Sequence, residues 1–386
     1  MLKVLHMVSQ ELFIESSKHI SIYMLKYIEG GEYMMNFLKG LGWVVGIVIC
    51  IFLVYLLVMT ITDYRPEDRI PLKVENQQKQ KMQKDKVFTV DTYNIGYCGM
   101  DKDQDFFMDG GKGSRSSSKE KTIENLNGIT EFLANNDSTF VFVQEVDTNA
   151  TRSFHVNQYE HLKNNLKDYS SSFAINYKTL WVPVPMLKPH GRVNSAGLVT
   201  LSKYSVDSAT RYQFPGKESW PRQLAELDRC FLESRISLEN GKELVLINSH
   251  LSAYDKGGKI RVQQLGFLKE YIDKEYKNGN YVVVGGDWNH LIPTTDPSIF
   301  KTTEEWPDWL QEIPDDFKPE GFTWAADKNV PTTRTDVTPY VKDVNFTAVI
   351  DGYLVSDNIE ILNVKGHSLD FQYTDHNPVT MEFKLK

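Results

Sequence analysis

The run from Leu41 to Ile61 constrains this chain more than any other segment, because its 21 residues carry no charge. At roughly 1.5 Å per residue, a helix of this length matches a bilayer core of about 30 Å. A buried core helix rarely lacks polar residues on every face. A cleaved signal peptide has a shorter apolar region, about 7–15 residues, and ends in small residues, whereas polar residues come directly after Ile61. We therefore expect residues 41–61 to form one uncleaved transmembrane anchor.

The segments on either side of this run differ in character. Residues 1–40 contain several methionines, and MNFLKG from Met35 has the short, lysine-bearing form usual before an anchor. We interpret residues 1–40 as a lead-in whose first 34 residues belong to an over-extended start. Residues 62–86 are polar and end in NQQKQKMQKDK, which predicts a solvated stalk. The remaining residues, 87–386, are expected to form one folded domain.

Charge and cysteine content exclude several classes of protein. The chain has 43 basic and 51 acidic side chains and a net charge of -8. The broad basic surface of a tight, non-specific nucleic-acid binder is therefore absent, although a small basic patch remains open. Three cysteines without a CxxC pair or a Cys/His cluster indicate neither a disulfide framework nor structural zinc.

Strand-like and helix-like patterns alternate through residues 87–386. Helical periodicity is present at 121–136 and from Val262 to Ile272. Strands are expected at 86–95, 138–146, 195–204, 229–238, 243–251, 281–289, 347–356, 359–366 and 377–385. Pairs of strands with helices outside predict an α/β fold of two packed sheets covered by helices.

Polar side chains come directly after several of these apolar strands. They are Asn94, Glu145, His250, Asp287 with Asn289, Asp351, and Asp375 with His376. Each one alone has an ordinary explanation, such as a turn cap, a core histidine or an Asx turn. Together they indicate a functional site, because ligands bind where strands emerge from packed sheets.

The residue types in this set agree on one chemistry. Carboxylate and amide oxygens suit Mg²⁺ or Mn²⁺ rather than zinc. Two histidines near carboxylates can orient a water molecule and protonate a leaving oxygen. The sequence has no G-x-S-x-G elbow, so water is the expected nucleophile.

In order along the chain, these motifs resemble the endonuclease/exonuclease/phosphatase (deoxyribonuclease-like) superfamily, and the chain resembles a membrane-anchored, bacterial-type member. The motifs are TYNI at 92–95, QE at 144–145, NSHL at 248–251, GDWN at 286–289, IDGYLVS at 350–356 and TDH at 374–376. The resemblance covers roughly 300 of the 386 residues. It implies a four-layer α-β-β-α sandwich of two mixed sheets over residues 87–386, and a metal-dependent phosphoesterase.

The resemblance also implies a role for each residue of the set. Glu145, Asn94 and Asp375 resemble the family's metal-side residues, with Mg²⁺ or Mn²⁺ as the cofactor. The expected catalytic residues are His250, Asp287, Asn289, Asp351 and His376, of which Asp287 orients water and Asp351 holds the tautomer of His376. Arg229 is similar to an arginine that contacts phosphate, and a surface ion pair is its alternative.

Three functions remain open. A nuclease-type phosphodiesterase is favoured by the nearest motif pattern. A phosphoesterase for lipid or inositol-phosphate headgroups is favoured by the acidic balance and the anchor; LWVPVPMLKPHG at 180–191 then either dips toward lipid or packs on the sandwich edge. A non-catalytic binding module is the third, and the intact residue set argues against it. The expected partners are a phosphodiester substrate and the membrane, and no obligate protein partner is evident.

The side of the membrane on which the domain lies is indicated in two opposite ways. Within 20 residues of the anchor, more Lys and Arg lie after it than before it, which favours the cytoplasm under the positive-inside rule. A very short lead-in starting at Met35 resembles a signal anchor that exports the domain C-terminal to it. We predict a single-pass membrane protein with an extracytoplasmic domain.

Overall fold

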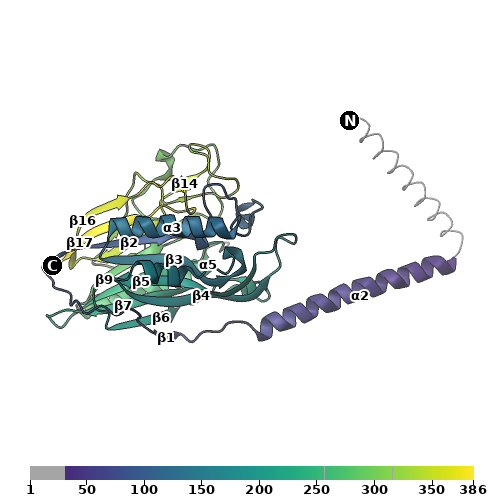
Figure 1. The fold of residues 1–386 in the computed structure, drawn as a ribbon, viewed down its shortest axis with the longest axis horizontal. Helices are drawn as coiled ribbons and strands as arrows, with labels where there is room; N and C mark the ends of the chain where they lie inside the picture. Colours follow the sequence, from purple (N-terminus) through teal and green to yellow (C-terminus); the bar gives the residue numbers. More distant parts are fainter. Residues whose placement is uncertain (1–30, 256, 315) are drawn as a thin grey trace. The chain divides into compact units, whose positions relative to one another are not determined.

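The protein is described by a computed structural model that covers residues 31–255, 257–314 and 316–386 (Figure 1). The chain divides into two compact units, of which the second spans Thr62–Lys386. In the first, α2 (Gly31–Ile61) holds a stretch of 28 residues, Met34–Ile61, that is long and apolar enough to cross a membrane. The helix begins ten residues before the predicted anchor, so it includes the end of the predicted lead-in. The rest of that lead-in lies outside the described residues.

The second unit contains two large mixed sheets. The seven-stranded sheet has the order β1 (Arg69–Leu72), β6 (Ser208–Gln213), β7 (Cys230–Ser237), β8 (Glu243–His250), β9 (Tyr281–Asp287), β15 (Asp351–Ser356) and β12 (Phe322–Ala325). The six-stranded sheet has the order β16 (Ile359–Gly366), β17 (Val379–Leu385), β2 (Val87–Asn94), β3 (Phe140–Ala150), β5 (Gly191–Ser202) and β4 (Ser170–Val182). Pairs β8–β9 and β2–β3 are parallel.

The two sheets pack face to face, and helices cover their outer faces. The core between the sheets joins residues such as Phe88 and Phe142 of one sheet to Leu246 and Val283 of the other. Helices α3 (Lys119–Asn136) and α4 (Gln158–Asn165) cover the six-stranded sheet, and α3 lies alongside β2 and β3 in Figure 1. Helix α5 (Lys259–Lys277) covers the seven-stranded sheet. The expected four-layer α-β-β-α sandwich is therefore confirmed.

Local sequence explains where the covering helices lie. Helix α3 begins after Ser118, whose side chain accepts a hydrogen bond from the Lys121 backbone N–H, as at a usual N-cap. Leu126, Ile129 and Leu133 are buried against the sheet. Within the two segments of helical periodicity, Ile123 and Val262 are exposed, so the buried apolar face of each helix begins at Leu126 and Leu265.

The prediction of a solvated stalk at 62–86 is wrong for much of that segment. Strand β1 pairs with β6, and backbone hydrogen bonds join Glu75 to Ser171 in both directions. Met82 is 1% exposed and belongs to the core between the sheets. The segment is polar because most side chains of residues 76–86 are exposed, while β1 is an edge strand, where Pro71 is tolerated and one side faces solvent.

Met82 provides a direct test of this correction. Met82→Ala is expected to lower the free energy of unfolding by about 2–5 kcal/mol, the usual cost of such a truncation in a core. Met186→Ala is the matched control, because Met186 is 89% exposed. Urea unfolding of both variants in detergent provides the measurement. An unchanged urea midpoint of unfolding for Met82→Ala would indicate that this segment is a solvated stalk after all.

Candidate active site

The strand pairing brings several of the predicted site residues to one edge of the seven-stranded sheet. His250 and Asp287 are register partners in the parallel pair β8–β9. Asp287 is also the register partner of Asp351, in the antiparallel pair β9–β15. Neighbouring strands lie about 4.8 Å apart, so the three side chains start from adjacent backbone positions.

Asp287 lies at the centre of this group and is 2% exposed. Its Oδ2 is 3.3 Å from His250 Nε2 and 3.8 Å from His376 Nε2. The same oxygen accepts a hydrogen bond of 3.0 Å from Asn94 Nδ2, which reaches it from the other sheet. Burial, and then the negative charge of Asp351, raise the pKa of Asp287 to about 7, while His376 opposes this shift.

His376 is held by Asp351. The distance from His376 Nδ1 to Asp351 Oδ2 is 2.8 Å, and the backbone N–H of Asp351 donates to Thr332 Oγ1. Burial disfavours the charged ring, but Asp351, Asp287 and Asp375 together raise the pKa of His376 well above its usual value. These carboxylates favour the charged form of the His376 ring, with Nδ1 donating to Asp351.

The pKa of His250 shifts in the opposite direction. Burial, followed by the positive charges of Arg229 and His376, lowers the pKa of His250 well below its usual value. Its Nδ1 is buried and has no hydrogen-bond partner in the described part of the chain. Burying such an atom without a partner is costly, so a polar ligand is expected to meet it. The site therefore combines one imidazole whose pKa is lowered with one whose pKa is raised.

Glu145 and Asn94 come from the ends of the parallel pair β2–β3. Glu145 has a positive φ of 57° and lies in a register shift of β3; such strained backbone is concentrated at functional sites. Glu145 Oε1 accepts a hydrogen bond of 3.2 Å from Asn94 Nδ2. Burial raises the pKa of Glu145, Arg152 opposes this, and Asp375 adds to it. Asn94 Oδ1 accepts from the Gly96 N–H, so Asn94 faces Glu145 with its amide hydrogens.

Asp375 lies beside the same group. Its Oδ2 is 4.0 Å from His376 Nε2, and its Oδ1 accepts from Thr374 Oγ1 at 2.9 Å. Gly96 makes room for it: φ at Gly96 is 46°, and a Cβ there would lie 2.6 Å from Asp375 Oδ1. The absence of a side chain at residue 96 therefore allows β2 to approach the TDH segment.

The donor set fits a hard divalent cation. Asp287, Asp351 and His376 form a buried group whose candidate ligand atoms lie within 4.8 Å of one another. In that group Asp351 and His376 already bond to each other. Glu145 and Asp375 add two carboxylates, and burial together with the charge of Asp375 raises the pKa of Glu145, as is usual where a cation offsets such charges.

Arg229 contributes charge to the site, whereas Asn289 contributes hydrogen bonds. The Arg229 charge acts on Glu145, Asp287 and His250, and its buried Nη1 has no hydrogen-bond partner among the residues described. The alternative of a surface ion pair is not observed for Arg229 in that part of the chain. Asn289 donates its backbone N–H to Asp287 Oδ1 at 2.8 Å and its side-chain N–H to Leu251 O at 2.9 Å. Asn289 thus positions Asp287.

Two charged residues near the site were missed in the sequence. Arg152 forms a buried ion pair of 2.9 Å with Asp147 and is the main positive charge acting on Glu145. Asp336, which interacts with Asp375, pairs with Arg334. Neither comes directly after an apolar strand, so no pattern marked them. Asp147 lies five residues before Arg152, and Arg334 lies two residues before Asp336. Such spacings indicate only an ordinary ion pair.

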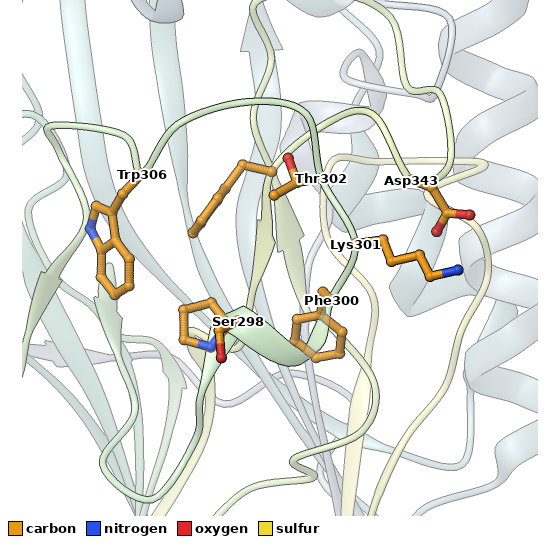
Figure 2. A pocket seen from close by; sticks show the side chains of 8 residues that line it. Ser298, Phe300, Lys301, Thr302, Trp306 and Asp343 are labelled. Atoms are coloured by element: carbon orange, nitrogen blue, oxygen red, sulfur yellow. The ribbon is translucent and has the colours of Figure 1, made fainter.

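A separate cavity of about 640 Å³ lies in the segment between β10 (His290–Leu291) and β14 (Thr347–Ala348). Figure 2 shows its lining, with Trp306 on one side and Lys301 and Asp343 on the other. Its lining residues are Pro297, Ser298, Phe300, Lys301, Thr302, Trp306, Asp343 and Phe346. None of the predicted site residues lines this cavity, so the cavity is not part of the candidate active site.

A four-layer sandwich with paired carboxylates and two histidines at its strand ends defines a class of hydrolases that act on phosphoesters. The sequence model of one family, the endonuclease/exonuclease/phosphatase family, matches residues 92–376. The chain belongs to that family, which confirms the resemblance seen in the sequence. A search of curated proteins finds no match to the chain.

Solved structures of low sequence identity align with most of this chain. An endonuclease/exonuclease/phosphatase from Beutenbergia cavernae DSM 12333 is 17% identical, with a TM-score of 0.55, over 78% of this chain and 72% of its own. A Bacteroides vulgatus protein of the same description is 15% identical, over 78% and 100%, with a TM-score of 0.48. D. rerio TDP2, complexed with a single-strand DNA product, is 14% identical, over 78% and 100%, with a TM-score of 0.49.

Proposed function

We propose that this chain is a membrane-anchored, divalent-metal-dependent phosphoesterase that hydrolyses a phosphodiester by direct attack of water. One observation carries the proposal: the Asp287 carboxylate lies within 4 Å of two imidazole rings, those of His250 and His376. A carboxylate can accept a proton from water, and an imidazolium can stabilise or protonate a phosphoryl or leaving oxygen.

Each site residue has its own part in this reaction. Glu145 and Asp375 would hold Mg²⁺ or Mn²⁺, which when bound supplies charge stabilisation at a phosphoryl oxygen. Asp287 orients the attacking water and takes its proton. His376, oriented by Asp351, donates from Nε2, and Arg229 adds a second positive charge near Asp287. His250, whose Nε2 faces the Asp287 carboxylate at 3.3 Å, accepts a hydrogen bond from water at its unpartnered Nδ1.

The covalent step balances without a further reactant. The water oxygen forms a bond to phosphorus while one P–O ester bond breaks, and one water proton passes to Asp287. The leaving alkoxide takes a proton from His376 Nε2, and the products are a phosphomonoester and an alcohol. The helix α2, long and apolar enough to span a bilayer, anchors the enzyme to the membrane.

Metal removal tests the oxygen-ligand assignment. Activity on bis(p-nitrophenyl) phosphate should vanish with EDTA and return with Mg²⁺ or Mn²⁺. Glu145→Gln should raise the Mg²⁺ concentration needed for half-maximal activity by about 10-fold or more, because it removes a charge from the donor set. Glu131→Gln, at an exposed position of α3, is the control. Full activity in EDTA would refute the metal role, and equal Mg²⁺ requirements in the two variants would remove Glu145 from it.

A further inference from the structure

The chain enters the second unit at the edge of the seven-stranded sheet that carries the candidate active site. Arg69 pairs with Tyr212, and the Gln213 N–H donates to Asp68 O. The antiparallel pairs β6–β7 and β7–β8 place Gln213 opposite Cys230, and Phe231 opposite Ser249. Asp68 is therefore three strands from His250, about 15 Å at the usual strand spacing.

The residues just before β1 are packed on the same unit. The Lys178 Nζ lies 5.5 Å from the centre of the Tyr64 ring, and the charges of Arg211 and Asp228 act on the Tyr64 hydroxyl. Only Thr62 and Asp63 separate Tyr64 from Ile61, the last residue of α2. An extended chain spans at most about 3.5 Å per residue. A helix that crosses a bilayer would therefore hold Tyr64 within about 10 Å of the membrane boundary.

An exposed apolar loop lies in the six-stranded sheet, at the strand ends near which Glu145 is found. It is formed by residues 183–190 between β4 and β5, and we call it the apolar loop. Met186 is 89% exposed and Leu187 is fully exposed. Because β5 is antiparallel to β3, with Val146 opposite Gly197, the start of β5 lies at the edge where Glu145 is found. Lys178, which contacts Tyr64, belongs to β4, so the loop comes after a strand that touches the chain's entry.

The base of the apolar loop is fastened next to the site, while its tip projects. Ser114 Oγ donates to Lys188 O and Arg115 Nε donates to Pro189 O. The His190 ring packs on Tyr97, with 6.2 Å between ring centres. The Arg152 guanidinium lies over the Tyr97 ring, 4.1 Å from its centre. The charge of Arg152 lowers the pKa of Glu145. A rigid base fixes the height of the exposed tip relative to the catalytic residues.

The charge around the loop suits an anionic bilayer surface. Residues 178–192 contain no Asp or Glu, although the whole chain has a net charge of -8. Lys178, Lys188 and Arg192 are exposed. Exposed apolar side chains with flanking cations are the pattern of interfacial lipid binding, and a large exposed apolar tip otherwise has no benefit in water.

We propose that the apolar loop inserts into the membrane surface and, together with the nearby chain entry, holds the active-site edge against the bilayer. The substrate is then a phosphodiester presented in the headgroup layer of the membrane: a phospholipid rather than a nucleic acid. This inference rests on the proposed function, because it assigns a substrate class to the same site. It selects the lipid alternative left open by the sequence.

Lipid contact of the loop can be measured in the full-length protein reconstituted into phosphatidylcholine–phosphatidylglycerol vesicles. In a Cys50→Ser background, the remaining cysteines are buried, so one added cysteine can be labelled with a fluorophore. Val184→Cys and Val87→Cys are a matched pair, because both valines are 45% exposed and Val87 starts β2, at the opposite end from Asn94. Lipids with spin-labelled acyl chains should quench the probe at residue 184 and not at residue 87. Equal quenching at both positions would overturn the docking proposal.

Activity separates the inference from the proposed function. Leu187→Asp should lower hydrolysis of phosphatidylglycerol in the vesicles by about tenfold or more, and leave hydrolysis of soluble bis(p-nitrophenyl) phosphate unchanged. No hydrolysis of either substrate by the wild type would refute the proposed function itself. Hydrolysis of the soluble ester with no lipid product, or of single-stranded DNA alone, would keep the proposed function and overturn the lipid assignment. Equal losses on both substrates would show that the loop does not act through the membrane.

Discussion

Replacing Asp287 by asparagine is expected to lower kcat for phosphodiester hydrolysis by about 10²–10⁴-fold, the range associated with a positioned general base. The side chain keeps its shape, and its oxygen can still accept from the Asn289 N–H, but it can no longer take a proton from water. Initial rates on bis(p-nitrophenyl) phosphate provide the measurement. Asp103→Asn, at an exposed position, is the control. A rate equal to that of the control would remove Asp287 from the chemistry.

The same variant has a stability signature that a misfolded protein would not show. Burial and Asp351 raise the pKa of Asp287 to about 7, above the value of about 3.9 expected in the unfolded chain. The ionised carboxylate therefore costs folding free energy, and the cost grows as pH rises from about 4 to about 7. In EDTA, the Tm of Asp287→Asn relative to wild type should increase over this interval. A constant difference would indicate an ordinary pKa for Asp287.

The second large effect is expected from the His376–Asp351 pair. His376→Ala and Asp351→Asn should each lower kcat by about 10²–10⁴-fold. The double variant should be little slower than the slower single variant, because the two residues act as one unit. The structural reason is the 2.8 Å contact between His376 Nδ1 and Asp351 Oδ2, which orients the ring and favours its charged form.

A double-mutant cycle on the soluble phosphodiester measures this coupling. His155→Ala is the matched control, since His155 is exposed and its ring hydrogen-bonds to Asn149 Oδ1. Losses that multiply across the His376 and Asp351 variants would show that the two residues contribute independently, and the tautomer-holding role of Asp351 would then be wrong.

The fold class could be predicted because each of its helices and strands is indicated by a local sequence pattern. Apolar strands such as ELVLI and YVVVG end in polar residues, and adjacent parallel pairing of β8 and β9 places His250 beside Asp287. The Asx turn at Asp287 was also visible, since Asn289 lies two residues after it. These features depend on a few neighbouring residues, so periodicity and motif order were sufficient.

Features that depend on partners distant in sequence could not be predicted. The segment RIPL of β1 is short, contains Pro71 and pairs with a strand about 140 residues later, so its composition resembled a stalk. Arg152 belongs to no recognised motif, and its position over Tyr97 depends on how β3 and the segment after β2 pack. The amide of Asn289 bonds to Leu251 O, which no local pattern indicates.

The sequence by itself determined which chemical groups this protein brings to its strand ends, because each group comes directly after the apolar run that buries its strand. Only the tertiary structure decided that the chain's entry at Asp68 and the exposed Leu187 share an edge with those groups. The physical reason is that strand order and sheet packing are set by contacts between residues far apart in the chain, such as Arg69 with Tyr212 and Phe231 with Ser249, whereas the alternation of apolar and polar residues specifies a strand but not its neighbour.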